Sequence, residues 1–349
     1  MSHSQTRSRL GRALVVFASV IVILAGLKAA ADIIVPFLLA AFIALLCTTP
    51  LFWLNKRGIP NTLSVILVLV GLLGISTVLG ITVGSSLKKF TKSLPTYRAS
   101  LQKQTDTVVS YLTEKGLNVD EYRETVTDTF DPSSAMGMAG TTLKKASGVL
   151  ANGFLILLTV VFILLEAVGM PRKLNRVLKH PEKTMAGFET FVQSVKQYLF
   201  IKTIVSAITG LLAGISTAVI GIDFPILWGV LAFAFNFVPN IGSFIAAVPP
   251  LLLGAVQHGP KAILSVVGSY VVINVVMGNI VEPRLTGQGL GLSTLVVFLS
   301  LVFWGWLLGP VGMLLSVPLT MIVKIACESN EKTKPIGILL GPASSQQSV

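Results

Sequence analysis

Charged side chains are rare in the second half of the membrane-spanning part of this 349-residue chain, and a group of polar side chains lies around one expected helix break and on the helix that follows. Residues 203–323 contain only four formally charged side chains, whereas amides and hydroxyls recur. The candidates for contact with a solute are Asn236, Asn240, Ser243, Asn274 and Asn279. Amides and hydroxyls both donate and accept hydrogen bonds, so this set suits a small, polar, uncharged ligand. The alternative for each asparagine is a hydrogen bond between helices that serves packing alone.

Prolines and glycines are expected to shape the backbone beside these polar groups. The positions assigned to the substrate pathway are Pro239, Gly242, Pro249, Pro310, Gly312 and Pro318. Proline lacks the backbone N–H and clashes with the preceding turn, so each such site frees carbonyl groups. In a membrane, free backbone groups are tolerated only where they line a cavity or are buried in protein.

Three ionisable residues are candidates for a gate or for ion coupling. Glu282 and Arg284 flank Pro283 at the end of an apolar run, and Glu166 lies near the end of another. Ionisable side chains inside membrane segments are functional candidates by default. The alternative for Arg284 is an interfacial anchor whose long side chain reaches the head-group region.

The composition indicates that membrane-spanning helices position these residues. Hydrophobic residues make up 53% of the chain and charged residues 12%, and the mean hydropathy is +0.81. Apolar stretches of about 20 residues recur, the length that spans a bilayer as a helix. We therefore expect an all-α polytopic membrane protein with about eight hydrophobic segments. The net charge of +12 resides mainly in short loops, as the positive-inside rule predicts, which argues against a nucleic-acid partner.

Signatures of enzymes and of bound metals are missing from the sequence. We find no nucleophile elbow, zinc-protease motif, phosphate-binding loop or dinucleotide fingerprint in a suitable context. Cys47 and Cys327 form neither a CxxC motif nor a pair with histidine at metal-ligand spacing. We predict that the chain is not an enzyme and needs no cofactor or metal.

The pattern of apolar and charged segments predicts five parts. These are three transmembrane helices (1–87), an extracytoplasmic amphipathic helical insertion (88–148), a fourth transmembrane helix with a cytoplasmic amphipathic helix (149–197), the transport core (198–324) and a cytoplasmic tail (325–349). Basic loops place both termini in the cytoplasm. A cleaved signal peptide at the first apolar run and a disordered insertion remain alternatives.

Two modules of similar design are predicted in the transport core. Spanning helices at 198–221 and 262–282 each precede a long apolar stretch, Phe224–Gln257 and Leu290–Val323. We expect breaks at residues 238–242 and 249–250 in the first stretch, and at 309–312 and 318 in the second. Two re-entrant hairpins would make an inverted repeat with a solute site near the bilayer midplane. A single crossing by each stretch would leave the C-terminus on the same side.

Three motifs resemble those of the autoinducer-2 exporter family, the permeases of the PerM/TqsA type. They are Phe235–Ser243 followed by Ala246–Pro250, Gly278–Arg284 and Gly309–Pro318, and the resemblance covers nearly the whole chain. It implies a multi-pass protein of the bacterial inner membrane that exports autoinducer-2 or a related polar metabolite. It also implies a homo-oligomer, with a pentamer among the forms it allows. Some relatives are described as cation/proton antiporters.

The leading functional hypothesis is export of a small polar metabolite through a cavity formed by the two interrupted stretches. The expected partners are this solute and the lipid bilayer. Sodium–proton exchange, with Glu282 or Glu166 as the titrating carboxylate, is the first alternative. A membrane scaffold that recruits partners through residues 88–148 and transports nothing is the second.

Overall fold

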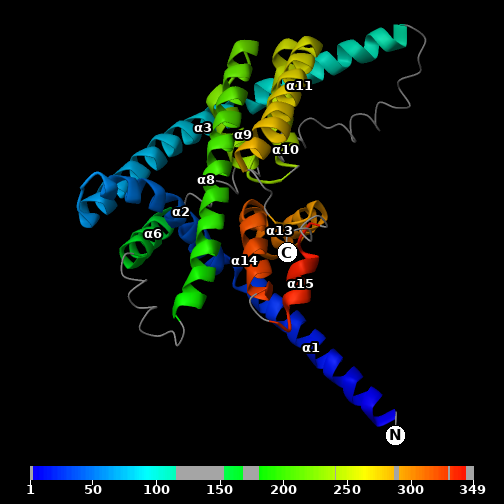
Figure 1. Ribbon diagram of the computed structural model, residues 1–349. Coiled ribbons are helices and arrows are strands. Elements are labelled where there is room, and N and C mark those ends of the chain that lie inside the picture. The colour runs from blue at the N-terminus through cyan, green and yellow to red at the C-terminus, as the bar shows by residue number, and fades with distance from the viewer. Residues whose placement is uncertain are drawn as a thin grey trace. The chain divides into compact units, whose positions relative to one another are not determined.

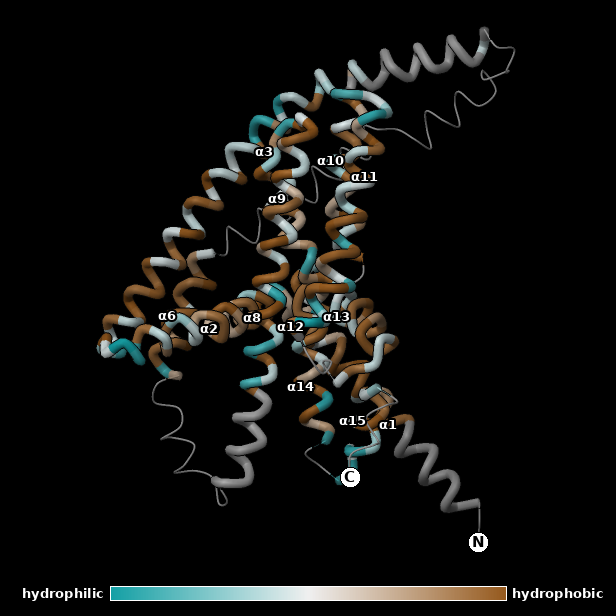
Figure 2. The backbone as a smooth tube through the Cα atoms, turned by 45° about the horizontal axis from the view of Figure 1, so that its top comes forward, coloured by the Kyte–Doolittle hydropathy of each residue, from teal (hydrophilic) through white to brown (hydrophobic). Residues whose placement is uncertain are grey.

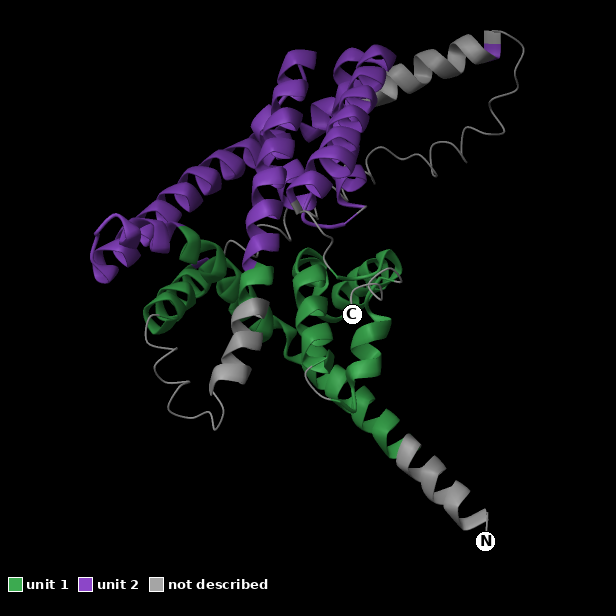
Figure 3. Ribbon diagram, viewed as in Figure 1, with its two compact units in different colours: residues 1–49, 154–195, 291–349 green, residues 50–153, 196–290 purple. Residues whose placement is uncertain are grey.

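The computed structural model describes residues 3–114, 153–167, 181–239, 241–286, 291–328 and 331–342, and every regular element in these ranges is helical (Figure 1). The chain divides into two compact units (Figure 3). Unit 1 comprises Met1–Thr49, Phe154–Val195 and Gly291–Val349, and unit 2 comprises Pro50–Gly153 and Lys196–Leu290. The helices are α1 (His3–Ala29), α2 (Ala31–Lys56), α3 (Asn61–Glu114), α6 (Gly153–Ala167), α8 (Pro181–Ile220), α9 (Pro225–Phe235), α10 (Gly242–His258), α11 (Pro260–Asn274), the π-helix η1 (Val275–Val281), α12 (Glu282–Thr286), α13 (Thr294–Leu314), α14 (Ser316–Glu328) and α15 (Lys334–Leu339).

Five helical segments in the described part of the chain are long and apolar enough to cross a membrane. They are Ala31–Lys56, Asn61–Tyr97, Val192–Ile220, Pro260–Leu285 and Thr294–Leu314. Four shorter apolar helices accompany them, at Leu14–Ala29, Gly153–Ala167, Pro225–Phe235 and Gly242–His258. Hydrophobic residues run along most of α2, α6 and α13, with hydrophilic residues mainly near helix ends (Figure 2). The predicted class, an all-α polytopic membrane protein, is confirmed, whereas the number of segments and the inverted repeat stay predictions.

Two helices continue through boundaries that composition suggested. Helix α3 runs for 54 residues through the predicted start of the insertion at residue 88, with Pro95 inside it. Its apolar part ends near Tyr97, so one helix carries the chain from an apolar into a polar environment. The rest of the predicted insertion, residues 115–148, lies outside the described residues. Helix α8 likewise joins the predicted amphipathic helix and the following span into one 40-residue helix.

Glycines bring α8 and α9 into close contact. A Cβ placed on Gly210 would lie 2.6 Å from the carbonyl oxygen of Gly229, and one on Gly229 would lie 2.8 Å from that of Gly210. Gly214, one turn after Gly210, faces the same part of α9. Small residues four apart let helix backbones approach closely in lipid, where dispersion and hydrogen bonding drive association. The first module is therefore packed through backbone contact.

Helices α9 and α10 form a hairpin, so the stretch Phe224–Gln257 doubles back at residues 236–241. Gly242 packs on the end of α9, where a Cβ would overlap the carbonyl oxygen of Phe235. The break predicted around Pro239 is thus observed. The second break predicted in this stretch was wrong, because Pro249 and Pro250 lie inside the continuous helix α10. Each proline deprives the carbonyl four residues earlier of its hydrogen bond, and the helix nevertheless continues.

The second stretch also reverses direction, within unit 1. Gly309 interrupts α13 with φ 69° and ψ −152°. Beyond it the chain returns along α13, because the indole Nε1 of Trp304 donates to the hydroxyl of Thr320 at 3.0 Å. The break expected near Pro318 occurs at Leu315, so Pro318 lies in the first turn of α14, where proline is tolerated.

The reversal at Gly309 uses the same backbone conformation as the α10–α11 turn. Gly259 there has φ 70° and ψ −156°, and each of the two glycines is followed by a proline that begins the next helix. Glycine adopts positive φ without a Cβ clash, and proline at the first helical position gives up no hydrogen bond. The two turns with the same backbone conformation are therefore those at Gly309 and Gly259, which are 50 residues apart. The sequence had instead suggested that Pro310 corresponds to Pro239.

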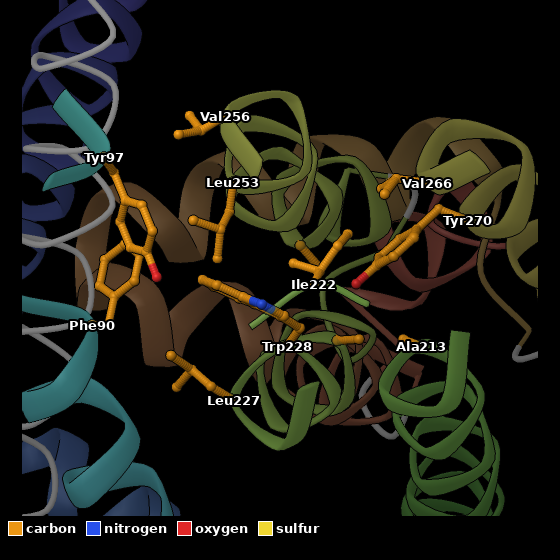
Figure 4. Packing of buried hydrophobic residues seen from close by; sticks show 12 residues of the cluster. Phe90, Tyr97, Ala213, Ile222, Leu227, Trp228, Leu253, Val256, Val266 and Tyr270 are labelled. Atoms are coloured by element: carbon orange, nitrogen blue, oxygen red, sulfur yellow. The ribbon is translucent and has the colours of Figure 1, made fainter. Parts of the chain in front are cut away.

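An aromatic cluster holds α3, α9, α10 and α11 together in unit 2 (Figure 4). Phe90 packs edge-on against Trp228, with ring centroids 5.8 Å apart, and against Phe224 at 5.9 Å. Trp228 is fully buried and donates its indole N–H to the carbonyl of Asp223 at 2.7 Å. The long helix α3 is thereby attached to the hairpin of the predicted transport core.

Candidate functional site

A small pocket lies where four helices of unit 2 meet. Helices α8, α9, α10 and α11 line it with Thr209, Ala213, Ala232, Ser243, Ala246, Tyr270, Ile273 and Asn274. None of these side chains carries a formal charge. The hollow has an empty volume of about 260 Å³ including its open mouth. Its enclosed part has room for about one water molecule.

Two residues of this pocket have buried hydroxyl groups without partners in the described part of the chain. The Oγ1 of Thr209 and the OH of Tyr270 find no hydrogen-bond partner among the residues that the structure describes. The two residues are only 6% and 8% exposed. In Figure 4 the ring of Tyr270 points its hydroxyl toward the interior of the cluster, on the side of Ile222 and Ala213. Sequence reasoning missed both residues, because isolated hydroxyls on apolar helices carry no distinguishing pattern.

Asn236 fixes the α9–α10 break to α8. Its side-chain Nδ2 donates to the hydroxyl of Ser206 at 2.9 Å, and Ser206 is fully buried. For this asparagine the observed bond is the interhelical packing contact that the sequence left as its alternative role. The bond determines where the break lies along α8, about one turn from Thr209.

A partly buried ion pair joins α8 to the beginning of α12. The Nζ of Lys202 donates to both carboxylate oxygens of Glu282, at 2.7 and 2.9 Å. The Lys202 side chain is 7% exposed and that of Glu282 is 26% exposed. A charge buried in an apolar environment requires a partner, because its desolvation is otherwise uncompensated. The sequence identified Glu282 but did not single out Lys202, which lies inside the apolar run of the spanning helix 198–221.

The helix between the pocket and this ion pair changes its winding. Helix α11 ends at Asn274 and continues as the seven-residue π-helix η1. π-helical segments are rare and often accompany functional sites, because the extra residue per turn displaces side chains and backbone groups. Asn274 therefore lies at the point where regular winding ends, and it lines the pocket.

The remaining predicted site residues lie in several places. Of the asparagines, Asn279 is exposed on η1, and Asn240 lies outside the described residues. Arg284 is exposed on α12 and is not the described partner of Glu282. The residues that belong to unit 1 are Glu166, Pro310, Gly312 and Pro318. Within unit 2 the structure brings Ser243 and Asn274 together around the pocket, and a cavity shared by both interrupted stretches stays a prediction.

Asp223 connects three elements at the other end of α8. Its carboxylate Oδ2 accepts from the hydroxyl of Tyr97 at 2.8 Å and from the amide of Gln257. Its backbone N–H donates to the Oε1 of Gln257 at 3.2 Å. The ring Nε2 of His258 lies 3.0 Å from the carbonyl of Gly221. These bonds tie the α8–α9 loop to α3 and to the end of the hairpin.

Replacing Tyr97 by phenylalanine is expected to lower the stability of unit 2 moderately. The substitution removes one hydrogen bond to a carboxylate that is exposed and keeps Gln257 as a donor, so we expect a loss of about 1 kcal/mol. Thermal unfolding of the detergent-solubilised protein measures it. Thr91→Ala on the exposed face of α3 is the control and should change stability by less than about 0.5 kcal/mol. Equal effects of the two changes would mean that the Tyr97–Asp223 bond contributes nothing.

Comparison with known proteins identifies related transporters. The model of the AI-2E family transporter matches residues 17–332. The "AI-2 transport protein TqsA" of Escherichia coli is 42% identical over 326 residues, which cover 93% of this chain and 94% of that protein. The "Putative transport protein YhhT" of Escherichia coli is 38% identical over 325 residues, 93% of each chain. A similarly named protein of Haemophilus influenzae is 41% identical over 341 residues, 97% of this chain and 98% of its own.

Proposed function

Because this chain belongs to the AI-2E transporter family, we propose that it exports a small, polar, uncharged metabolite, autoinducer-2 or a related signal molecule, across the bacterial inner membrane. The observation that carries the proposal is the small uncharged pocket where four helices of unit 2 meet, whose lining residues include one amide and three hydroxyl side chains. Amide and hydroxyl groups in its lining match a ligand that presents hydroxyls. The relative TqsA, named for transport of AI-2, supports the choice of solute.

The pocket is smaller than the solute in the described conformation. Its enclosed room corresponds to about one water molecule. A transporter exposes its site to one side of the membrane at a time by moving one bundle against another. We infer that the described state is closed around the pocket and that export requires α9–α10 to move relative to α8 or α11.

The ion pair argues for a neutral solute rather than for sodium–proton exchange. Both oxygens of Glu282 accept from Lys202, so the carboxylate already has its counter-charge. A cation that used Glu282 as a ligand would have to displace a buried ammonium, which would then be left uncompensated. We propose that the pair closes one end of the pathway and separates when the pathway opens there.

Contacts at the two ends of unit 2 support a hairpin topology. Tyr97 meets Asp223 and Gln257, and all three positions share the outer face if the stretch Phe224–Gln257 is a re-entrant hairpin rather than a single crossing. At the other end the ammonium of Lys196 lies 5.4 Å from the ring centroid of Phe52, and both positions are predicted near the cytoplasm. Residues predicted to share a side of the membrane therefore meet, and the cytoplasmic location of both termini rests on the positive-inside rule. We further propose a homo-oligomer, by analogy with the family.

Transport by purified protein in liposomes tests the proposal. Vesicles loaded with autoinducer-2 should lose it faster with the protein than without, and a sodium gradient should not drive proton movement. Asn274→Ala should slow efflux about tenfold, since loss of a buried hydrogen bond to a solute costs about 1–2 kcal/mol. Ser265→Ala, which lies outside the pocket on the same helix, should transport like the wild type. Sodium–proton exchange without autoinducer-2 efflux would contradict the proposal.

A deletion distinguishes a transporter from a scaffold that transports nothing. Removing residues 115–148, with α3 kept to Glu114, should leave efflux intact if the transport core still assembles. A scaffold would lose its function with that segment. Monodisperse elution of the shortened protein is the control for assembly.

A further inference from the structure

Thr209 and Tyr270 are in an environment that ordinary packing does not explain. Within the described residues both hydroxyls lack partners, and both residues are more than nine-tenths buried. A threonine on a helix can usually bond to its own preceding turn, as Thr217 does on the same helix at 2.9 and 3.0 Å. A buried hydroxyl without a partner costs free energy, so such groups in native proteins call for a specific explanation. Both hydroxyls belong to one pocket.

The backbone of α10 adds an acceptor to the same place. Ala246 lines the pocket, and the residue four positions later is Pro250, which has no N–H. The usual helical hydrogen bond to the Ala246 carbonyl is therefore missing. A proline inside a continuous helix thus removes the normal donor for the carbonyl of a residue that lines the pocket.

The uncharged lining of the pocket favours a neutral ligand. Ser243 and Asn274 contribute further groups that can donate or accept, and no lining residue is charged. An ion would be desolvated here without a counter-charge, which is strongly unfavourable. A neutral hydroxyl of the ligand can donate to one group and accept from another, and its size suits the enclosed room.

We propose that Thr209 and Tyr270, with Asn274, form a subsite for one hydroxyl group of a neutral polyhydroxylated solute in the pocket between α8, α10 and α11. This inference rests on the proposed function and deepens it, because it assigns recognition to two residues and defines the class of solute. The partners that these hydroxyls lack within the described protein are supplied by the solute. Specificity against apolar compounds follows, since these would leave both hydroxyls unsatisfied.

Equilibrium binding to the full-length protein in lipid nanodiscs tests the subsite, with autoinducer-2 and erythritol as probes. Thr209→Val and Tyr270→Phe remove the hydroxyls while preserving shape. Each should raise the dissociation constant about tenfold. Neither should lower the unfolding temperature without ligand, because each hydroxyl has no partner in the described protein to lose. Thr217→Val, two turns along α8, is the matched control and should bind like the wild type.

The possible results separate the subsite from the proposed function. Wild-type binding of a probe with unchanged affinity in both variants would overturn the subsite, whatever the transport assay reports. Binding of erythritol but not autoinducer-2, lost in the variants, would support the subsite and reject autoinducer-2 as the solute. Binding of neither probe, or binding of Na⁺ that the variants lose, would overturn the inference. A lower unfolding temperature in both variants would assign the hydroxyls to packing.

Discussion

Replacing Lys202 by methionine is expected to destabilise the protein by about 3 kcal/mol, the lower end of the range measured when one partner of a buried ion pair is removed, because the Glu282 side chain is 26% exposed. The change leaves the carboxylate of Glu282 without its ammonium in a region where Lys202 itself is only 6% exposed. We expect a large loss of monodisperse protein and a lower unfolding temperature in detergent. A fluorescence-detected size-exclusion melt measures both.

A second substitution distinguishes the contribution of the ion pair from the general effect of losing a lysine. Lys202→Met combined with Glu282→Leu removes both charges and should recover most of the stability, because apolar replacements of a buried pair are often neutral or stabilising. Lys334→Met is the exposed control, since the Lys334 and Glu331 side chains are 50% and 89% exposed, and its effect should stay below about 0.5 kcal/mol. No recovery in the double variant would show that Lys202 acts independently of Glu282.

Alanine at Gly242 or Gly312 is expected to disrupt the corresponding helical reversal. A Cβ at Gly242 would overlap the carbonyl oxygen of Phe235, and one at Gly312 would overlap that of Trp304. Both obstacles are backbone atoms, which cannot rotate away as a flexible side chain can. We expect a loss at or above the upper end of the about 1–3 kcal/mol typical of overpacking, with little folded protein recovered. Yield and unfolding temperature measure it.

Gly268→Ala is the matched control for these variants. Gly268 lies inside α11, and no atom lies within 4 Å of the position that its Cβ would occupy. Alanine in a helix interior is favoured over glycine by about 0.5–1 kcal/mol, so this variant should be as stable as the wild type or slightly more so. Normal folding of Gly242→Ala would show that the α9–α10 turn can open, and the tight hairpin would then be incorrect.

Two of the residues that line the pocket could be anticipated from the sequence, and their role in transport stays a prediction. Ser243 and Asn274 were predicted and line one pocket, and Glu282 was recognised as an unusual carboxylate. Thr209 and Tyr270 could not be found in this way, because a hydroxyl on an apolar helix is equally compatible with bonding to its own helix. Whether it has a partner depends on which helices meet there.

Proline shows the limit of local reasoning most clearly. Pro239 and Pro249 looked alike in the sequence, yet the chain turns at the first and continues as helix through the second. Proline removes a hydrogen bond in either case, and neighbouring helices determine whether the helix tolerates the loss. The true reversals lie where Gly242 permits close approach and where Gly309 adopts positive φ.

The amino-acid sequence by itself determined the membrane class, the all-helical character and the family, because hydropathy and short motifs are properties of neighbouring residues. Only the tertiary structure decided that Lys202 neutralises Glu282, that Asn236 bonds to Ser206, and that two hydroxyls share one pocket. Residues 80 and 30 positions apart form these two bonds. Such contacts depend on the packing of whole helices, which periodicity along one segment does not encode.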